Sequence, residues 1–259
     1  MSIQTNKSQS TSTKDEFTFH SLKAMILESG VWEHLNELRK RIVYAVIGLA
    51  ITTAASFIFT EQILELLARP AGGVDALQAI HVTETIEAYM RISLMSGLIF
   101  ALPWVAYQLL AFVLPGLEEH EKKWVYIGIP SITLLFLSGV AFTYFIMLPA
   151  AIPFLLQFLG INTVPQVSDY VNFVTSLMFW VGVAFQMPLI AFVLAKLRIL
   201  KAVHLSSQWR IAIVAIAVAA AVITPTGDPI NMGLLMLPLS VLYGLSILLA
   251  WLARRNETE

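Results

Sequence analysis

Long stretches without a charged side chain are the feature of this sequence that most restricts its fold. Residues 42–60, 92–117 and 170–195 each lie between two charged residues and contain none themselves. A helix needs about 20 largely apolar residues to cross the roughly 30 Å hydrocarbon core of a membrane. Each interval is long enough for one crossing, so the sequence predicts a helical protein that spans a membrane several times.

Two further regions need to be divided into spans. The charge-free interval 124–168 is too long for one crossing, and Pro149 and Pro153 interrupt it, so we predict a span ending near residue 148 and a partly buried loop after it. The turn signal Thr224–Asn231 predicts a tight hairpin whose first arm is only about 20 Å long. The six expected spans are residues 42–60, 92–114, 124–148, 170–195, 209–224 and 230–252.

The composition agrees with a single membrane domain. Hydrophobic residues make up 58% of the chain and charged residues 13%, which excludes an ordinary soluble domain. The net charge of -1 gives no basic surface for nucleic acid, and the absence of cysteine excludes disulfides and thiolate metal sites. We expect a disordered tail over residues 1–20, one membrane domain over 21–253 and a second tail over 254–259.

The positively charged residues predict the orientation. With six spans, 14 of the 16 Lys and Arg residues fall in the termini and in the second and fourth loops, and only Arg69 and Arg91 fall on the other side. Because Lys and Arg are enriched on the cytoplasmic side, both termini are predicted to be cytoplasmic. Prolines at span ends and interiors, with helices of unequal length, favour a concave, glove-like wall of helices over a compact bundle.

Signatures of enzymes and ATPases are missing from the sequence. It contains no Walker loop, glycine-rich dinucleotide turn, His-Glu-x-x-His helix or Gly-x-Ser-x-Gly elbow. The five histidines fall in loops or tails. An intramembrane aspartyl protease needs two carboxylates in one site, and Asp228 has no such partner within a span. We therefore expect no catalysis, no metal site and no cofactor.

Three segments together resemble a known family. They are the block Glu33–Arg41 before the first span, the block Phe112–Lys123 after the second, and the turn Thr224–Asn231. Their order and spacing, over residues 31–252, resemble the TatC family, the receptor component of the twin-arginine protein translocase. The turn after Ala68 and the segment Phe145–Pro149 are also similar to that family.

The resemblance implies a function. It implies a non-enzymatic receptor in the bacterial inner membrane that binds the twin-arginine signal peptides of folded proteins. Export would be driven by the proton motive force. The implied partners are TatA-like and TatB-like single-span proteins and further copies of the chain.

The resemblance also assigns residues to the signal-peptide site. Glu37 and Glu121 match the two carboxylates that receive the arginine pair, and Arg39 matches a further position of the first motif. From the residues alone, Glu37 could equally be a surface i,i+4 partner of Arg41 and Glu121 a solvated loop acid. Arg39 could also anchor the topology or hold Glu37 in place.

Three more candidate functional residues lie in or between the last three predicted spans. Most members of the family resemble this stretch but have Glu at the position of Gln186. An amide cannot titrate, so a proton-linked role of this position is in question. A helix–helix hydrogen bond is the alternative role of Gln186. Gly244 likewise replaces a common Glu in a region implied to contact the single-span partners, although glycine also permits close helix packing. Asp228 either closes the hairpin turn or contributes to docking.

A secondary transporter of a small solute is the alternative function. Six spans, the interior Gln186 and the kinking prolines would suit a transporter. However, no internal repeat and no midplane cluster of charges supports this class.

Overall fold

The structure is a computed structural model that describes residues 12–114, 122–157, 163–196, 200, 202–224 and 229–255. The described part is helical, apart from turns and one isolated parallel bridge between Gln78 and Gln166. This confirms the all-α fold class for the described residues. Among the described residues, five helical segments are long and apolar enough to span a membrane, namely Trp32–Ala71, Glu84–Phe112, Ile127–Leu156, Val167–Lys196 and Met232–Ala253, and Trp209–Ile223 is a shorter apolar helix.

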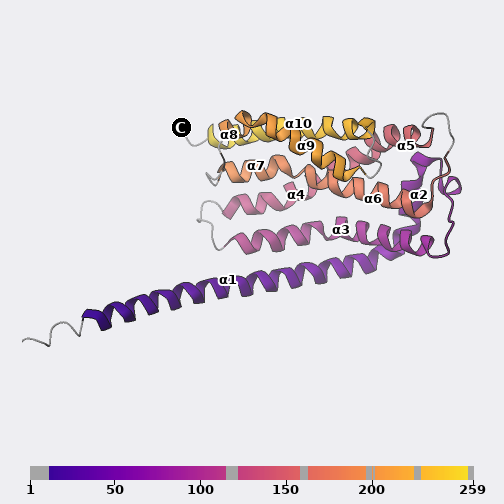
Figure 1. The fold of residues 1–259 in the computed structure, drawn as a ribbon. Helices are drawn as coiled ribbons and strands as arrows, with labels where there is room; N and C mark the ends of the chain where they lie inside the picture. Colours follow the sequence, from indigo (N-terminus) through magenta and orange to yellow (C-terminus); the bar gives the residue numbers. More distant parts are fainter. Residues whose placement is uncertain are drawn as a thin grey trace, which may run out of the picture.

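The first half of the chain forms two long helices joined by short ones. Helix α1 (Ser12–Ser56) is followed by η1 (Phe57–Phe59), α2 (Thr60–Ala68), η2 (Arg69–Ala71) and η3 (Val74–Ala76). Helix α3 (Glu84–Val113) then returns antiparallel to α1 (Figure 1). Gly72 and Gly73 have φ of 104° and 106°, and this left-handed backbone allows the tight turn after α2.

The second half of the chain contains more broken helices. Helix α4 (Lys122–Phe142) runs through a π-helical turn, η5 (Thr143–Met147), into α5 (Leu148–Leu156). Helix α6 (Val167–Ala184) and helix α7 (Met187–Lys196) are separated by a short break. Helix α8 (Ala202–Ser207), helix α9 (Trp209–Ile223) and helix α10 (Pro229–Arg255) complete the chain.

Proline explains the break between α6 and α7. Pro188 has no N–H, so it cannot donate to the carbonyl of Ala184 four residues earlier. The N–H of Gln186 donates to the carbonyl of Val183 at 3.0 Å, a tightened turn, and helical bonding resumes where Ile190 donates to Gln186 at 2.9 Å. The break therefore places Gln186 at a bend inside an apolar span.

Two expectations from the sequence are wrong. The first part of the loop predicted after residue 148 is helical, because α5 continues from Leu148 to Leu156, whereas residues 163–165 are not helical. Pro149 lies in the first turn of α5, where its missing N–H is tolerated, and the π-helical turn before it shifts the register. The tail predicted to be disordered over residues 1–20 is helical from Ser12, as part of α1.

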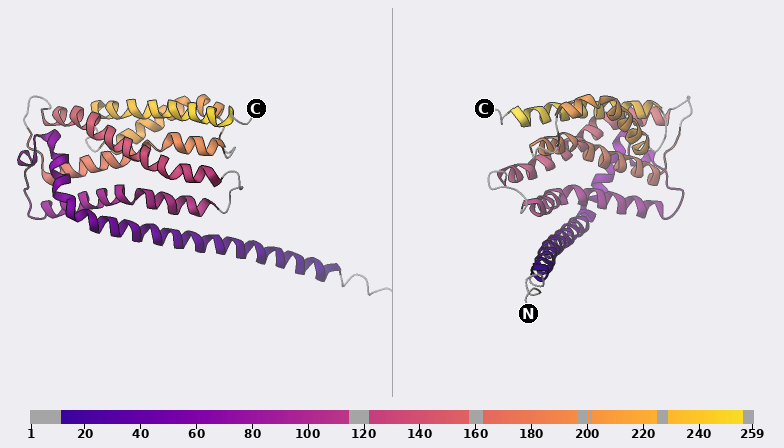
Figure 2. Two further views of the ribbon diagram at one scale, coloured as in Figure 1. Left: turned by 180° about the vertical axis from the view of Figure 1, so that it is seen from behind. Right: turned by 60° about the vertical axis from the view of Figure 1, so that its left-hand side comes forward.

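The helices lie side by side in a stack with α1 along one edge (Figures 1 and 2). Helix α1 packs on α3, which also contacts α4 and α6, while α7 and α9 pack on α10. The N-terminal part of α1 extends beyond the other helices. In the most apolar part of the segment that contains α1, only 6% of the residues are buried. Helix α1 is therefore held almost entirely by α3.

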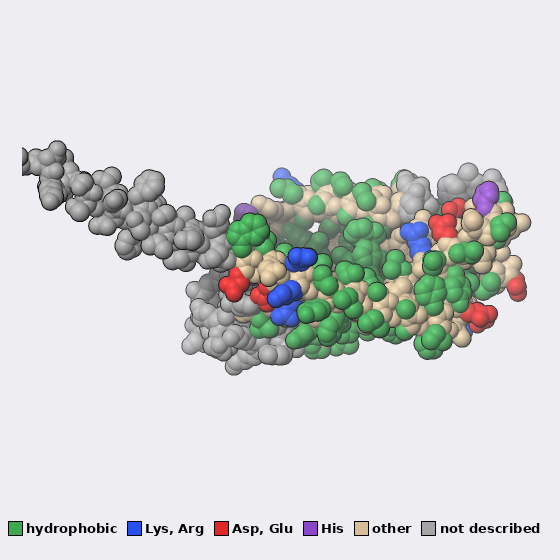
Figure 3. All heavy atoms as spheres, turned by 90° about the horizontal axis from the view of Figure 1, so that it is seen from below, with side chains coloured by type: hydrophobic (Ala, Val, Ile, Leu, Met, Phe, Trp, Pro, Cys, Tyr) green, Lys and Arg blue, Asp and Glu red, His purple; other side chains and the backbone are tan. Residues whose placement is uncertain are grey.

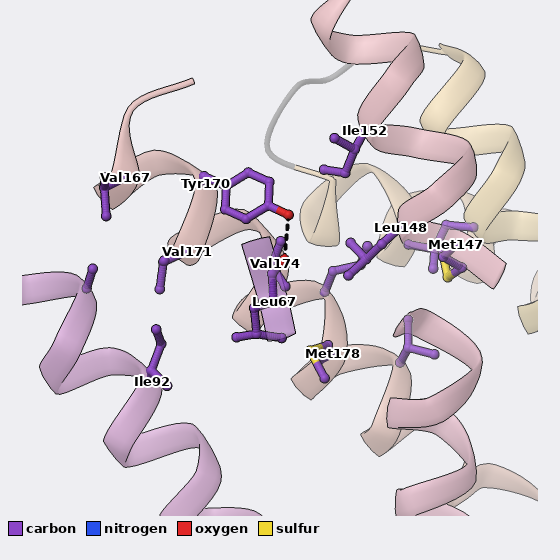
Figure 4. Close-up of a cluster of buried hydrophobic side chains, with 14 of the residues drawn as sticks. Leu67, Ile92, Met147, Leu148, Ile152, Val167, Tyr170, Val171, Val174 and Met178 are labelled. Carbon is purple, nitrogen blue, oxygen red and sulfur yellow. Dashed lines mark hydrogen bonds between the residues drawn. The ribbon is translucent and has the colours of Figure 1, made fainter. Parts of the chain in front are cut away.

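A hydrophobic core lies at the end of the stack where α2, α5 and the start of α6 meet. Leu67, Ile92, Leu148 and Val174 are among its buried side chains. The hydroxyl of Tyr170 donates to the carbonyl of Leu67 at 2.6 Å, and apolar side chains such as Val174 and Leu148 lie near this bond (Figure 4). This core fixes the end opposite to the charged residues of α1.

Hydrophobic side chains cover the middle of the face in Figure 3, and charged side chains gather toward its two ends. Large apolar side chains on α1 and α3, such as Ile47, Ile51 and Phe100, are exposed. A soluble protein rarely exposes so continuous an apolar surface. The arrangement is that of a protein whose middle contacts lipid and whose ends contact water.

Candidate functional site

The antiparallel pair of α1 and α3 carries the first group of residues singled out by the sequence. Near the end of α3, the ring of Phe112 stacks on the ring of His34, with centroids 4.4 Å apart. Further along the same two helices, the indole N–H of Trp104 donates to the carbonyl of Tyr44 at 2.9 Å. These contacts fix the register of the two helices around Glu37.

Close packing continues along the same pair of helices. The hydroxyl of Thr52 donates to the carbonyl of Gly97 at 2.8 Å. A Cβ on Gly97 would overlap the backbone of Thr53, and one on Gly48 would overlap the indole of Trp104. Glycine is therefore required at both positions for α1 to approach α3 this closely. The register at Glu37 depends on this approach.

Glu37 lies on the face of α1 that turns toward α3, in contact with Arg41 one turn later. Nη2 of Arg41 is 3.4 Å from Oε1 of Glu37, and the side chains of Arg41 and Glu37 are 29% and 32% exposed. Nη1 of the same guanidinium donates to Oε1 of Gln108, on α3, at 3.2 Å. Gln108 is buried, with 3% of its surface exposed. Arg41 thus joins a carboxylate of α1 to a buried amide of α3.

Sequence reasoning missed Gln108 even though a signal for it was present. An amide side chain inside an apolar span requires a hydrogen-bond partner, and the rule that drew attention to Gln186 applies equally to Gln108. The bond to Arg41 satisfies this requirement. The sequence could not show, however, that residues 41 and 108 face each other across two helices.

Arg39 is not part of this group. It lies two residues after Glu37, which turns it by about 200° around the helix. Its side chain is exposed and makes no hydrogen bond or ion pair with another described residue. The structure therefore does not support Arg39 as the residue that holds Glu37 in place. Arg41 makes the contact with Glu37 instead.

Glu121 lies outside the described residues, so its position relative to Glu37 is not known from the structure. The end of α3 and the start of α4, which border its segment, lie at the same end of the stack (Figure 1), and near that end of α3 Phe112 stacks on His34, one turn before Glu37. The described residues that border the second predicted carboxylate are therefore at the end where the site would need them.

The chemistry available around Glu37 is that of cation binding. Within the ranges that the structure describes, no group of His, Cys, Asp and Glu side chains could hold a metal ion. A carboxylate that is one-third exposed and beside an arginine is suited to a guanidinium, which presents two donors to a carboxylate.

Gln186 makes one of its possible contacts at the bend between α6 and α7. Its Nε2 donates to the carbonyl of Ile132, on α4, at 2.8 Å. Its Oε1 is buried and has no hydrogen-bond partner among the described residues. The helix–helix hydrogen bond considered from the sequence is thus present, and one acceptor remains without a donor.

The structure describes Gly244 but not Asp228. Gly244 lies in α10 and is exposed, and a Cβ built on it would meet no atom within 4 Å. Close helix packing within this chain therefore does not require glycine there. Asp228 lies outside the described residues, between the end of α9 and the start of α10.

Comparison with known proteins identifies what the chain resembles. The family model described as Sec-independent protein translocase protein (TatC) matches residues 33–238. The Sec-independent protein translocase protein TatC of Deinococcus radiodurans is 35% identical over 233 residues, covering 85% of each chain. The chloroplastic TATC protein of Pisum sativum is 33% identical over 220 residues, covering 83% of this chain and 62% of the plant protein.

A solved structure agrees with the sequence matches. The crystal structure of the twin-arginine translocase receptor TatC superimposes on the chain with a TM-score of 0.76 at 34% sequence identity. The match covers 85% of this chain and 99% of the crystallised one. Similarity at this level extends to the whole helical framework.

Proposed function

Because the chain belongs to the TatC family and is thus a non-enzymatic membrane component of the twin-arginine translocase, we propose that it binds twin-arginine signal peptides through Glu37. The observation that carries this proposal is the contact between Glu37 and Arg41. It shows that this carboxylate lies where a guanidinium can reach it. The secondary transporter considered from the sequence is set aside by the family match.

The environment of Glu37 supports recognition of arginine. Glu37 is partly buried, so a ligand charge bound there is less screened by solvent than one on an open surface. Arginine stays charged and offers a planar fork that matches a carboxylate. A pair of arginines in an extended peptide would need two acceptors, and Glu121 is the second carboxylate in this proposal.

The surroundings of the site fit a peptide that approaches from the water phase. The end of α7, which carries Lys196, and the start of α9, which carries Arg210, lie at the same end of the stack as the end of α3 (Figure 1). Because positive residues mark the cytoplasmic side, this end and both termini are assigned to the cytoplasm in our proposal, and the membrane is the bacterial inner membrane. Six spans arranged as a concave wall would present the site from that side, with α9 as the short fifth span.

The remaining parts of the proposal concern partners and energy. TatA-like and TatB-like proteins and further copies of the chain would complete the translocase, with transport driven by the proton motive force. Gln186 and Gly244 cannot exchange protons, so any proton-linked step would use other groups. The unpartnered Oε1 of Gln186 leaves an acceptor available at the bend of the α6–α7 span.

A peptide-binding assay tests the site. The purified chain in detergent would be titrated with a fluorescent twin-arginine signal peptide, using the wild type and the variants Glu37→Gln and Glu121→Gln. Glu33→Gln is the matched control, because Glu33 is exposed on the same helix one turn earlier. We expect both site variants to weaken binding at least tenfold and the control to leave it unchanged. Unchanged binding in Glu37→Gln would contradict the proposal.

A further inference from the structure

The guanidinium of Arg41 contacts two groups of different kinds. Its Nη2 contacts the carboxylate of Glu37 at 3.4 Å, and its Nη1 contacts the amide oxygen of Gln108 at 3.2 Å. The proposed ligand of Glu37 is also a guanidinium. In the structure, therefore, the chain's own arginine occupies the carboxylate that a ligand arginine would need.

The contact between Arg41 and Glu37 is weak enough to be displaced. Charge-assisted N–H···O bonds are typically about 2.7–2.9 Å long, and strong arginine–carboxylate pairs use two such bonds. Arg41 gives Glu37 a single contact of 3.4 Å. Oε2 of Glu37 has no partner among the described residues. An incoming arginine that makes two shorter bonds to Glu37 would therefore displace Arg41.

Gln108 provides the position to which Arg41 can withdraw. The amide is buried in α3, whose register against α1 is fixed by the stacked rings of His34 and Phe112. A half-buried guanidinium that loses its carboxylate needs another acceptor, because an unpaired buried charge is costly. The amide oxygen of Gln108 already accepts one bond from Arg41 and remains in place when Glu37 changes partner.

We propose that Arg41 is an internal competitor for Glu37, which a ligand arginine displaces onto Gln108, so that Arg41 and Gln108 set the affinity of the site. This inference rests on the proposed function of Glu37. In the unliganded chain the carboxylate is held by Arg41. When the peptide binds, its arginine forms two bonds to Glu37, and Arg41 keeps only its bond to Gln108.

The preference of the site for arginine over lysine comes from Glu37 itself. An ammonium group is a point charge that cannot form the two parallel bonds of a guanidinium. Displacing Arg41 from Glu37 costs the same free energy for either cation, so Arg41 lowers both affinities by the same factor.

Peptide titration of four variants tests this proposal. Arg41→Gln removes the competitor, and Lys40→Gln removes the same charge from a neighbouring exposed residue. An i,i+4 pair on a helix surface corresponds to about twofold in an equilibrium constant. We expect Arg41→Gln to lower the Kd for a twin-arginine peptide about twofold more than Lys40→Gln does. The Kd for a twin-lysine peptide should fall by the same factor, because displacing Arg41 costs the same for either cation.

Gln108→Leu provides the opposite change. Without the amide, Arg41 has only Glu37 as a partner, so the Kd should rise about two- to fivefold. In the double variant with Arg41→Gln, the same substitution should have no effect on binding. A residue that merely supports the fold would weaken binding in both backgrounds. Binding is normalised to the folded, monodisperse fraction.

The outcomes separate this inference from the function on which it rests. If Glu37→Gln leaves binding unchanged, the proposed function fails, and the competition proposal fails with it. If Glu37→Gln weakens binding but Arg41→Gln also weakens it, or strengthens it no more than Lys40→Gln, only the competition is refuted. An equal effect of Gln108→Leu with and without Arg41 would refute it as well.

Discussion

The packing of α1 on α3 can be tested by adding a single methyl group at Gly97. A Cβ at this position would lie 2.5 Å from Cα and 2.7 Å from the backbone N of Thr53. These are backbone atoms, so no rotation of a side chain relieves the overlap. The helices would have to separate by roughly 1 Å to restore ordinary contact, and overpacking of this kind costs about 1–3 kcal/mol.

A second contribution comes from the hydrogen bond across the same contact. Thr52 donates to the carbonyl of Gly97 at 2.8 Å, and separation of the helices by this amount would break the bond. Hydrogen bonds between membrane helices contribute about 0.6 kcal/mol on average. We therefore expect Gly97→Ala to lower the free energy of unfolding by about 2–3 kcal/mol.

Gly244→Ala is the matched control for this substitution. A Cβ on Gly244 would meet no atom within 4 Å, and both glycines lie inside long apolar helices. Alanine is favoured over glycine in a helix by up to about 1 kcal/mol, so the control should be neutral or slightly more stable. The control removes this general effect from the comparison.

Unfolding in a titration with sodium dodecyl sulfate, followed by tryptophan fluorescence, is the assay. Trp104 donates to Tyr44 across the same pair of helices, so its signal should respond to their separation. Equal stability of Gly97→Ala and Gly244→Ala would refute the close approach of α1 and α3. It would also remove the structural basis for the register around Glu37.

Three other substitutions test separate contacts by the same unfolding assay. Tyr170→Phe removes the buried bond to Leu67 and should cost about 1–3 kcal/mol, because the carbonyl loses its donor; no loss would contradict that bond. Thr52→Val keeps the side-chain shape and should cost less, about 0.6 kcal/mol, so a loss above roughly 2 kcal/mol would show that Thr52 does more than donate to Gly97. Gln186→Leu removes one bond to Ile132 but also a buried acceptor without a partner, so stability should change by less than about 1 kcal/mol; a large loss would show that Oε1 has a partner.

The sequence predicted the helical membrane fold because charge-free intervals leave few alternatives. A span of about 20 apolar residues can satisfy its backbone only as a helix in lipid, so length and charge alone were sufficient. What failed was the interpretation of Pro149 and Pro153. Both lie within α5, because proline is tolerated in membrane helices where neighbouring groups satisfy the backbone.

The prediction of a disordered N-terminal tail was wrong for a different reason. Its Ser, Thr, Gln and Lys residues suggested disorder, yet α1 begins at Ser12. Between Ser12 and Gly30 the sequence contains neither Pro nor Gly, so nothing interrupts a helix that continues into the first span. Composition described the polarity of this segment correctly but did not decide its backbone.

The candidate site was only partly accessible from the sequence. The spacing of Glu37 and Arg41 places them one turn apart on a helix, and the structure confirms that they are in contact. The role of Gln108 depends on how α1 and α3 align, which is set by contacts such as Trp104 with Tyr44 rather than by local pattern. Periodicity predicts which residues share a helix face, but the register between two helices is determined by packing.

The most direct test of the central claim is a measurement of the contact between a bound peptide and Glu37. A signal peptide with ¹⁵N-labelled guanidinium groups would be bound to the chain carrying ¹³C-labelled glutamate in lipid, and the dipolar coupling between the two would be measured by solid-state NMR. Our account predicts a coupling that fits a direct N–H···O bond of about 2.8 Å. In the Glu121→Gln background, which removes the second proposed acceptor, this coupling should be lost when Glu37 is also changed to Gln and retained with Glu33→Gln. In that background, a strong coupling that persists in Glu37→Gln, or no coupling with Glu37 intact while the peptide is bound, would contradict our account.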